Sequence, residues 1–172
     1  MGDGSPFGPI VSSAHLADGA LPSLSELEFG MILAGHAFER WMVRCMTAAG
    51  EPGLAPMDVL VLHFTTHRGR GKRLSDLCMV LGVEDTHVVN YAIKKLEKRG
   101  LVMTTRQGKE KLIGATTKGV ATCMRYREIR ETVLVESVRG VGLDPKATSQ
   151  VAATLRALSG HYDQAARTAA SL

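Results

Sequence analysis

The segment 75–115 constrains the fold more than any other part of the chain. It contains two helical patterns, each followed directly by a glycine, Gly82 after the first and Gly100 after the second. Glycine is the residue that most often ends a helix, because it adopts the left-handed conformation without strain. Two short apolar runs around a turn at 107–110 follow and predict a β-hairpin. The expected elements are helices at 75–81 and 85–99 and strands at 101–106 and 111–115.

The rest of the chain is predicted to be helical. The expected helices span 25–49, 56–67, 116–139 and 144–170. Ser25 is a suitable N-cap for the first, Pro56 opens the second, Thr116 or Thr117 caps the third, and the pair Asp144-Pro145 begins the last. No strand–helix alternation that could build a parallel sheet is present. The predicted fold class is therefore mainly α, with a small β-hairpin wing.

Residues 1–23 form an N-terminal arm that we expect to be extended or partly disordered. Three of the six prolines and several glycines fall in it, and both residue types interrupt regular structure. Its first residues have neither the basic start nor the apolar stretch of a secretory signal, so none is expected.

The composition excludes several classes of protein. A chain of 172 residues is long enough for one domain with one core, and no uncharged apolar run approaches the ~20 residues that span a bilayer. Three widely spaced cysteines argue against a disulfide scaffold and for a reducing, cytoplasmic location. We find no metal-ligand spacing, phosphate loop or nucleophile motif, so we expect no metal, no cofactor, no catalytic residues and no membrane partner.

The positive charge is concentrated in one part of the sequence. Residues 68–118 contain 12 Lys and Arg against 5 Asp and Glu, whereas the remainder has a net charge of −3. Such segregation indicates a module that binds a polyanion. The alternative is a solvated surface that happens to be basic.

The predicted helix 85–99 has two faces when its residues are placed at 100° intervals. The expected apolar face consists of Val88, Val89, Ala92, Ile93 and Leu96. The opposite face consists of His87, Asn90, Tyr91, Lys94 and Lys98, with Thr86 at its start. Asparagine can pair with adenine in the major groove and lysines can neutralise phosphates, so this face is typical of a DNA-recognition helix. The alternative is an ordinary amphipathic surface helix.

The predicted hairpin adds three further cations to this region. Arg106, Lys109 and Lys111 lie at its tip and flanks, and we expect them to contact the DNA backbone or the minor groove. The expected partner is double-stranded DNA. The competing hypothesis is a winged-helix module for protein–protein assembly, without sequence-specific DNA binding.

The sequence resembles the MarR family of winged helix-turn-helix regulators over residues 25–170. The stretch LSDLCMVLGVEDTHVVNYAIKKLEKRGLV (74–102) carries the resemblance, together with the hairpin and the T-x-K-G motif that ends at Gly119. One departure is the predicted turn 107–110, which lacks the Asp-x-Arg pair often found in the family's wing. The N-terminal arm is also unusual.

The resemblance implies a homodimeric, sequence-specific DNA-binding protein, usually a repressor. It divides residues 24–172, a single domain after the arm, into a DNA-binding lobe at 55–118 and dimerisation helices at 24–50 and 119–170. Apolar stripes on the terminal helices fit a dimer, because one chain has too few layers to cover them. The stripes are Leu27, Met31, Ala34, Phe38, Trp41 and Cys45 on the first helix and Val151, Leu155, Leu158 and Tyr162 on the last.

Many members of the family respond to small aromatic ligands, and some sense oxidants through cysteine. The candidate effector pocket comprises His36, Arg40, Trp41 and His63, with Arg44 nearby. Arginine and histidine beside an aromatic ring could hold an aromatic carboxylate. The alternative is a set of polar groups satisfied within the core or the interface. Cys45, Cys78 and Cys123 are expected to be buried and inert rather than redox-active.

Overall fold

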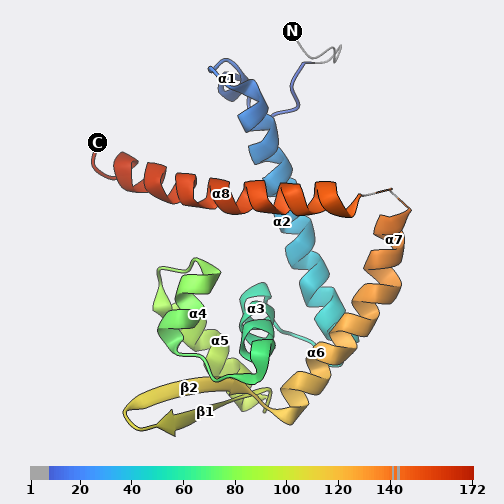
Figure 1. Cartoon of the computed structure of the whole chain (residues 1–172), viewed down its shortest axis with the longest axis vertical. Helices are drawn as coiled ribbons and strands as arrows, with labels where there is room; N and C mark the ends of the chain where they lie inside the picture. Colours follow the sequence, from blue (N-terminus) through green and yellow to red (C-terminus); the bar gives the residue numbers. More distant parts are fainter. Residues whose placement is uncertain (1–7, 141, 143) are drawn as a thin grey trace. The chain divides into compact units, whose positions relative to one another are not determined.

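Two helices and a hairpin follow one another in the middle of the chain, as the glycine-punctuated pattern predicts. The structure, a computed structural model, describes residues 8–140, 142 and 144–172. The chain divides into two compact units, residues 1–129 and residues 130–172. The first unit contains α1 (Ala14–Ala17), α2 (Pro22–Ala48), α3 (Pro56–Thr66), α4 (Leu74–Leu81), α5 (Thr86–Lys98), β1 (Val102–Gln107), β2 (Glu110–Ala115) and α6 (Thr117–Ile129). The predicted fold class, mainly helical with a two-stranded wing, is confirmed (Figure 1).

The core of the first unit brings together the end of α2, the three following helices and the start of β1. Its largest fully buried side chains include Met46 of α2, Leu62 of α3, Leu96 of α5 and Leu101 just before β1. Burial of each such side chain stabilises the fold by about 1.5–3 kcal/mol. The apolar face of α5 is therefore packed into this core, and its polar face is directed away from the core.

The turn between α4 and α5 follows a glycine, as the sequence predicts, and leads into an aspartate cap. Gly82 ends α4 in the left-handed conformation, at a φ of 63°, where an L residue would be strained. Asp85 caps α5, because its Oδ1 accepts a hydrogen bond of 2.9 Å from the backbone N–H of His87. Gly100, at a φ of 69°, then turns the chain into the hairpin.

The hairpin is antiparallel, and its turn is tight. Gln107 pairs with Glu110, which leaves two residues in the turn, and Gly108 takes a φ of 62° there. On its inner side Lys72 pairs with Ile113 through two backbone hydrogen bonds of 2.8 Å. This third segment fixes β2 against the segment that leads into α4.

The T-x-K-G motif joins the hairpin to α6. The Thr116 hydroxyl accepts from the backbone N–H of Gly119 at 3.1 Å and donates to the Gly100 carbonyl at 2.7 Å. Thr116 is therefore the cap, one of the two alternatives that the sequence left open. A Cβ at Gly119 would lie 2.0 Å from the carbonyl oxygen of Leu101, so only glycine allows this close approach.

The prediction for the N-terminal arm is wrong where the structure has helix, at residues 14–17 and 22–23. Residues 14–17 form the short helix α1, and α2 begins at Pro22 rather than at Ser25. Proline has a fixed φ that suits the first helical position, whereas the Ser25 hydroxyl donates to the carbonyl of Leu16 at 2.7 Å. The first seven residues lie outside the described part of the chain.

The predicted long helix 116–139 is not a single α-helix. Its α-helical part ends at Ile129, where the first unit ends, and a π-helical segment (Arg130–Val135) and α7 (Glu136–Arg139) follow in the second unit. The last helix, α8 (Pro145–Ala169), begins as predicted, because Asp144 Oδ2 accepts from the N–H of Ala147 at 2.7 Å.

No residue of α8 is buried within the chain. On the predicted apolar stripe of α8, Val151 is 57% exposed and Leu155 is 36% exposed. On α2, Leu33 and Phe38 are more than half exposed as well. Among the described residues, no helix combines the length and apolar character needed to cross a membrane.

Candidate nucleic-acid interface

The α5 helix presents a polar face to solvent. Val89, Ala92, Ile93 and Leu96 are buried, as predicted for its apolar face. Tyr91 is 71% exposed, and Asn90 is half-buried. Thr86, His87, Lys94 and Lys98 are exposed as well. The prediction was wrong for Val88, which is 44% exposed, because its position borders the polar face.

A hollow of about 470 Å³ separates α5 from the hairpin. Asn90 and Lys94 line it from the helix, and Thr104 and Lys111 line it from the hairpin. The hydroxyl of Thr104 donates to the carboxylate of Glu97, which ties the hairpin to this side of α5. The structure thus brings two of the predicted helix residues, Asn90 and Lys94, and one predicted wing residue, Lys111, to the same hollow.

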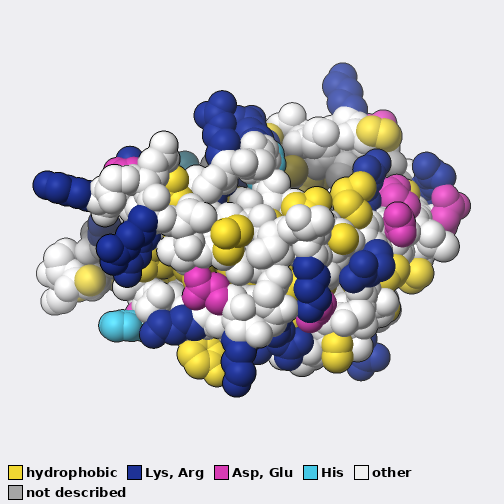
Figure 2. Space-filling view, turned by 90° about the horizontal axis from the view of Figure 1, so that it is seen from below, with side chains coloured by type: hydrophobic (Ala, Val, Ile, Leu, Met, Phe, Trp, Pro, Cys, Tyr) yellow, Lys and Arg dark blue, Asp and Glu magenta, His cyan; other side chains and the backbone are white. Residues whose placement is uncertain are grey.

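The three predicted cations of the hairpin are all exposed. Arg106 and Lys111 are partners in the strand register, and Lys109 lies in the turn. The hairpin is held near α4 by an ion pair between Arg73 and Glu110. In the view from below, Lys and Arg side chains outnumber Asp and Glu side chains (Figure 2). An excess of positive charge attracts polyanions.

Two further cations near the end of α5 have different surroundings. Lys95 forms an ion pair of 2.6 Å with Asp58, and Arg99 forms one of 3.4 Å with Glu51. Both carboxylates are buried. Neither acid was among the residues predicted from the sequence. Asp58 stands in the first turn of α3, a common place for a helix-capping carboxylate, and nothing nearby in the sequence points to Lys95.

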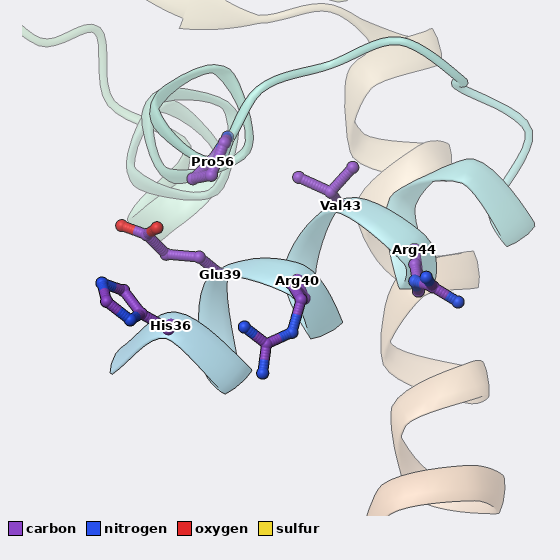
Figure 3. A pocket seen from close by; sticks show the side chains of 6 residues that line it. All are labelled: His36, Glu39, Arg40, Val43, Arg44 and Pro56. Carbon is purple, nitrogen blue, oxygen red and sulfur yellow. The ribbon is translucent and has the colours of Figure 1, made fainter. Parts of the chain in front are cut away.

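A second hollow, of about 340 Å³, lies on α2 next to the start of α3. His36 and Arg40 line it, as the effector prediction requires, together with Glu39, Val43, Arg44 and Pro56. The Glu39 carboxylate points toward α3, whereas the Arg40 guanidinium points away from it (Figure 3). Two arginines against one glutamate leave this hollow with an excess of positive charge.

The other two predicted effector residues do not line this hollow. His63 packs edge to face on Tyr126, with ring centroids 4.6 Å apart, and borders a separate hollow with Phe64 and His67. Burial lowers the pKa of His63, so its imidazole is neutral at pH 7 and supplies no positive charge. Trp41 Nε1 and His63 Nε2 are both buried and have no hydrogen-bond partner among the described residues.

All three cysteines are buried and free, as expected. Burial raises the pKa of the Cys123 thiol, although a hydrogen bond with Thr66 at 3.5 Å opposes this effect. Burial raises the pKa of Cys45 as well. Thiols of this kind carry little thiolate at neutral pH and react slowly with oxidants. The described residues also contain no group of three potential metal ligands.

Comparison with known proteins agrees with this architecture. Residues 54–119 match the family model of the winged helix DNA-binding domain. Among solved structures, CouR from Rhodococcus jostii, bound to p-coumaroyl-CoA, is similar with a TM-score of 0.65 at 20% identity, over 85% of this chain and 95% of that chain. The chain has a MarR-like winged helix fold.

Two further structures have the same fold. The transcriptional repressor CouR bound to a 23-mer DNA duplex has a TM-score of 0.65 at 20% identity, over 83% of this chain and 99% of that one. A MarR family regulator from Neisseria meningitidis has a TM-score of 0.65 at 19% identity, over 83% of this chain and 94% of that one. No curated protein matches the chain in sequence.

Proposed function

We propose that this protein is a transcriptional regulator that binds a specific DNA operator through α5 and the hairpin. The observation that carries the proposal is the exposed face of α5 within a winged helix domain, with His87, Asn90 and Tyr91 beside exposed lysines. In helix-turn-helix docking, the N-terminal residues of the recognition helix meet base edges and later residues meet phosphates. Thr86, His87 and Asn90 then read bases, and Lys94 and Lys98 hold the backbone. Tyr91 contacts either a base or a phosphate.

We further propose that the regulator is a homodimer whose operator is nearly palindromic. Exposed apolar side chains on both helices support this, Leu33 and Phe38 on α2 and Val151 and Leu155 on α8, because contiguous exposed apolar surface is typical of an interaction site. A two-fold dimer presents α5 twice, so its half-sites lie about one helical turn apart.

The dimer has a direct test in sedimentation. We expect the wild type to sediment as a dimer at micromolar concentration and Leu155→Glu to sediment as a monomer, because a buried, unpaired charge opposes association. Ala153→Glu is the matched control, since it places the same charge on the other side of α8. A monomeric wild type would contradict the homodimer.

The regulator is proposed to act as a repressor in the cytoplasm, released by a small aromatic ligand. The similar structures support this reading, because one is a repressor on DNA and another holds p-coumaroyl-CoA. In this chain the positive hollow with His36, Arg40 and Arg44 suits the anionic group of such a ligand. Trp41 and His63, which line no part of that hollow, stay in the proposal as residues near the junction of α2 and α3.

An electrophoretic mobility shift with genomic fragments tests the function. The protein is titrated at two salt concentrations, with random DNA of equal length as competitor. We expect a subset of fragments to shift at the higher salt concentration, where non-specific binding has weakened. If no fragment is preferred over random DNA, the proposal fails, and a protein-assembly module becomes the better interpretation.

The hairpin is expected to contribute affinity without sequence preference. Lys109→Ala should weaken binding to all duplexes about equally and reduce the slope of log K against log salt by about one, because one phosphate contact is lost. Binding titrations over a range of salt concentrations measure both quantities. A Lys109→Ala protein with altered sequence preference and an unchanged slope would show that the turn reads bases.

A further inference from the structure

Two of the cations at the end of α5, Lys95 and Arg99, form ion pairs with buried carboxylates of the same chain. Lys95 Nζ lies 2.6 Å from Asp58 Oδ2, and the side chain of Asp58 is only 3% exposed. The same carboxylate oxygen accepts a hydrogen bond of 2.7 Å from the backbone N–H of Ala55. The Lys95 ammonium is therefore held at a fixed point at the start of α3.

A second ion pair, between Arg99 and Glu51, lies one helical turn further along α5. Glu51, whose side chain is 8% exposed, pairs with Arg99 at 3.4 Å and with Lys118 at 2.7 Å. Arg99 also donates to the carbonyl of Pro52 at 2.6 Å, and Lys118 donates to the carbonyl of Arg99 at 3.0 Å. The loop after α2, the end of α5 and the start of α6 are thus joined at one buried carboxylate.

The two anchors, as we call Lys95 and Arg99, lie on one side of α5, because residues four apart share a face of a helix. The side chain of Lys95 is 27% exposed and that of Arg99 is 31% exposed, so both border the face that carries the predicted DNA-binding residues of α5. On the other border of that face, Glu97 is bonded to Thr104 of the hairpin. Contacts on both borders oppose rotation of α5 about its own axis.

We propose that Asp58 and Glu51 are positioning residues for α5. Through Lys95 and Arg99 they set the rotation of the helix, and so decide which side chains meet the bases. The proposal rests on the proposed function, DNA binding by the exposed face of α5. Under this proposal the basic residues of α5 are of two kinds. Lys94 contacts a DNA phosphate, whereas Lys95 holds the helix in place through its ion pair with Asp58.

The test compares these two neighbouring lysines. A duplex is first selected from a randomised pool on the wild-type protein, and a random-sequence duplex of equal length serves as the second probe. We expect Lys95→Met to bind the selected duplex about tenfold more weakly, with little change on the random duplex and an unchanged salt slope. We expect Lys94→Met to weaken both and to reduce the slope by about one.

Two further variants separate positioning from loss of folding. Lys95→Arg keeps the charge opposite Asp58 and should restore most of the selectivity. Asp58→Asn combined with Lys95→Met leaves no unpaired charge and should also lose selectivity, even if Lys95→Met alone folds poorly. All DNA titrations are made at a temperature well below the unfolding midpoint of each variant. If the ion pair only stabilised the fold, the ratio of the affinities for the two duplexes would stay unchanged under these conditions.

Three results would overturn the inference. Lys95→Met could lose affinity for both duplexes alike with a reduced salt slope, which would make Lys95 a phosphate contact. The folded variants could keep the wild-type ratio of affinities, which would leave the ion pair without a role in selectivity. A wild type that enriches no duplex from the pool would overturn the proposed function itself, and the positioning role with it.

Discussion

Gly119→Ala should lower the free energy of unfolding by about 3 kcal/mol or more, at the upper end of the range for overpacked sites. The new Cβ would lie 2.0 Å from the carbonyl oxygen of Leu101 and 3.2 Å from Leu62 Cδ1. The carbonyl cannot move freely, because it accepts a hydrogen bond of 3.0 Å from the backbone N–H of Thr116. Relief therefore requires α6 to move away from the hairpin, which opens the core.

Urea unfolding followed by circular dichroism measures this loss. Gly114→Ala is the matched control, because it makes the same substitution in the same unit at a site with no atom within 4 Å of the new Cβ. The control should be neutral or slightly stabilising, since alanine costs less conformational entropy than glycine. Equal unfolding midpoints for Gly119→Ala and the wild type would show that α6 can shift without cost.

Features set by neighbouring residues could be predicted from the sequence. Gly82 and Gly100 end helices because left-handed backbone favours glycine, and Asp85 and Asp144 cap helices because their side chains reach the next N–H groups. Each of these effects acts within one turn of helix. The order of the elements from α3 to the start of α6, which make up the winged helix domain, follows from such local signals.

Contacts between distant residues could not be predicted in this way. Lys95 and Asp58 are 37 positions apart, and Arg99 and Glu51 are 48 apart. In the sequence, a lysine that faces a buried carboxylate looks the same as one that faces solvent. The pattern therefore identified the polar face of α5 but not the two anchors beside it.

The four predicted effector residues do not line one hollow, and the reason is geometric. His36, Arg40 and Arg44 follow one another at intervals of four and line one hollow. Trp41 is one position from Arg40, about 100° around the helix, so it faces elsewhere. A strict helical count would have separated it from the others. The position of His63, packed on Tyr126, depends on how α3 meets α6, which no local pattern encodes.

Asn90→Ala should cost about 1–3 kcal/mol of binding to the preferred operator and little on random DNA, if the amide makes a bidentate contact with a base. Asn90 lines the hollow between α5 and the hairpin, with Lys94 and Lys111 beside it. An amide can donate and accept at once, as an adenine edge requires, whereas the lysines can only donate. The buried side chains under the helix, Val89 and Ile93, are untouched, so folding should be unaffected.

Competition binding with the selected duplex and with random DNA measures this difference directly. Gln150→Ala on α8 is the control, because it removes an exposed amide from the second unit and should leave both affinities at their wild-type values. If Asn90→Ala weakens both duplexes alike, the amide contributes only to general affinity. If it weakens neither, α5 does not read sequence through this residue. A loss confined to the operator, together with an unchanged unfolding midpoint, would identify Asn90 as a base-reading residue, because a backbone contact lowers both affinities and a folding defect shifts the midpoint.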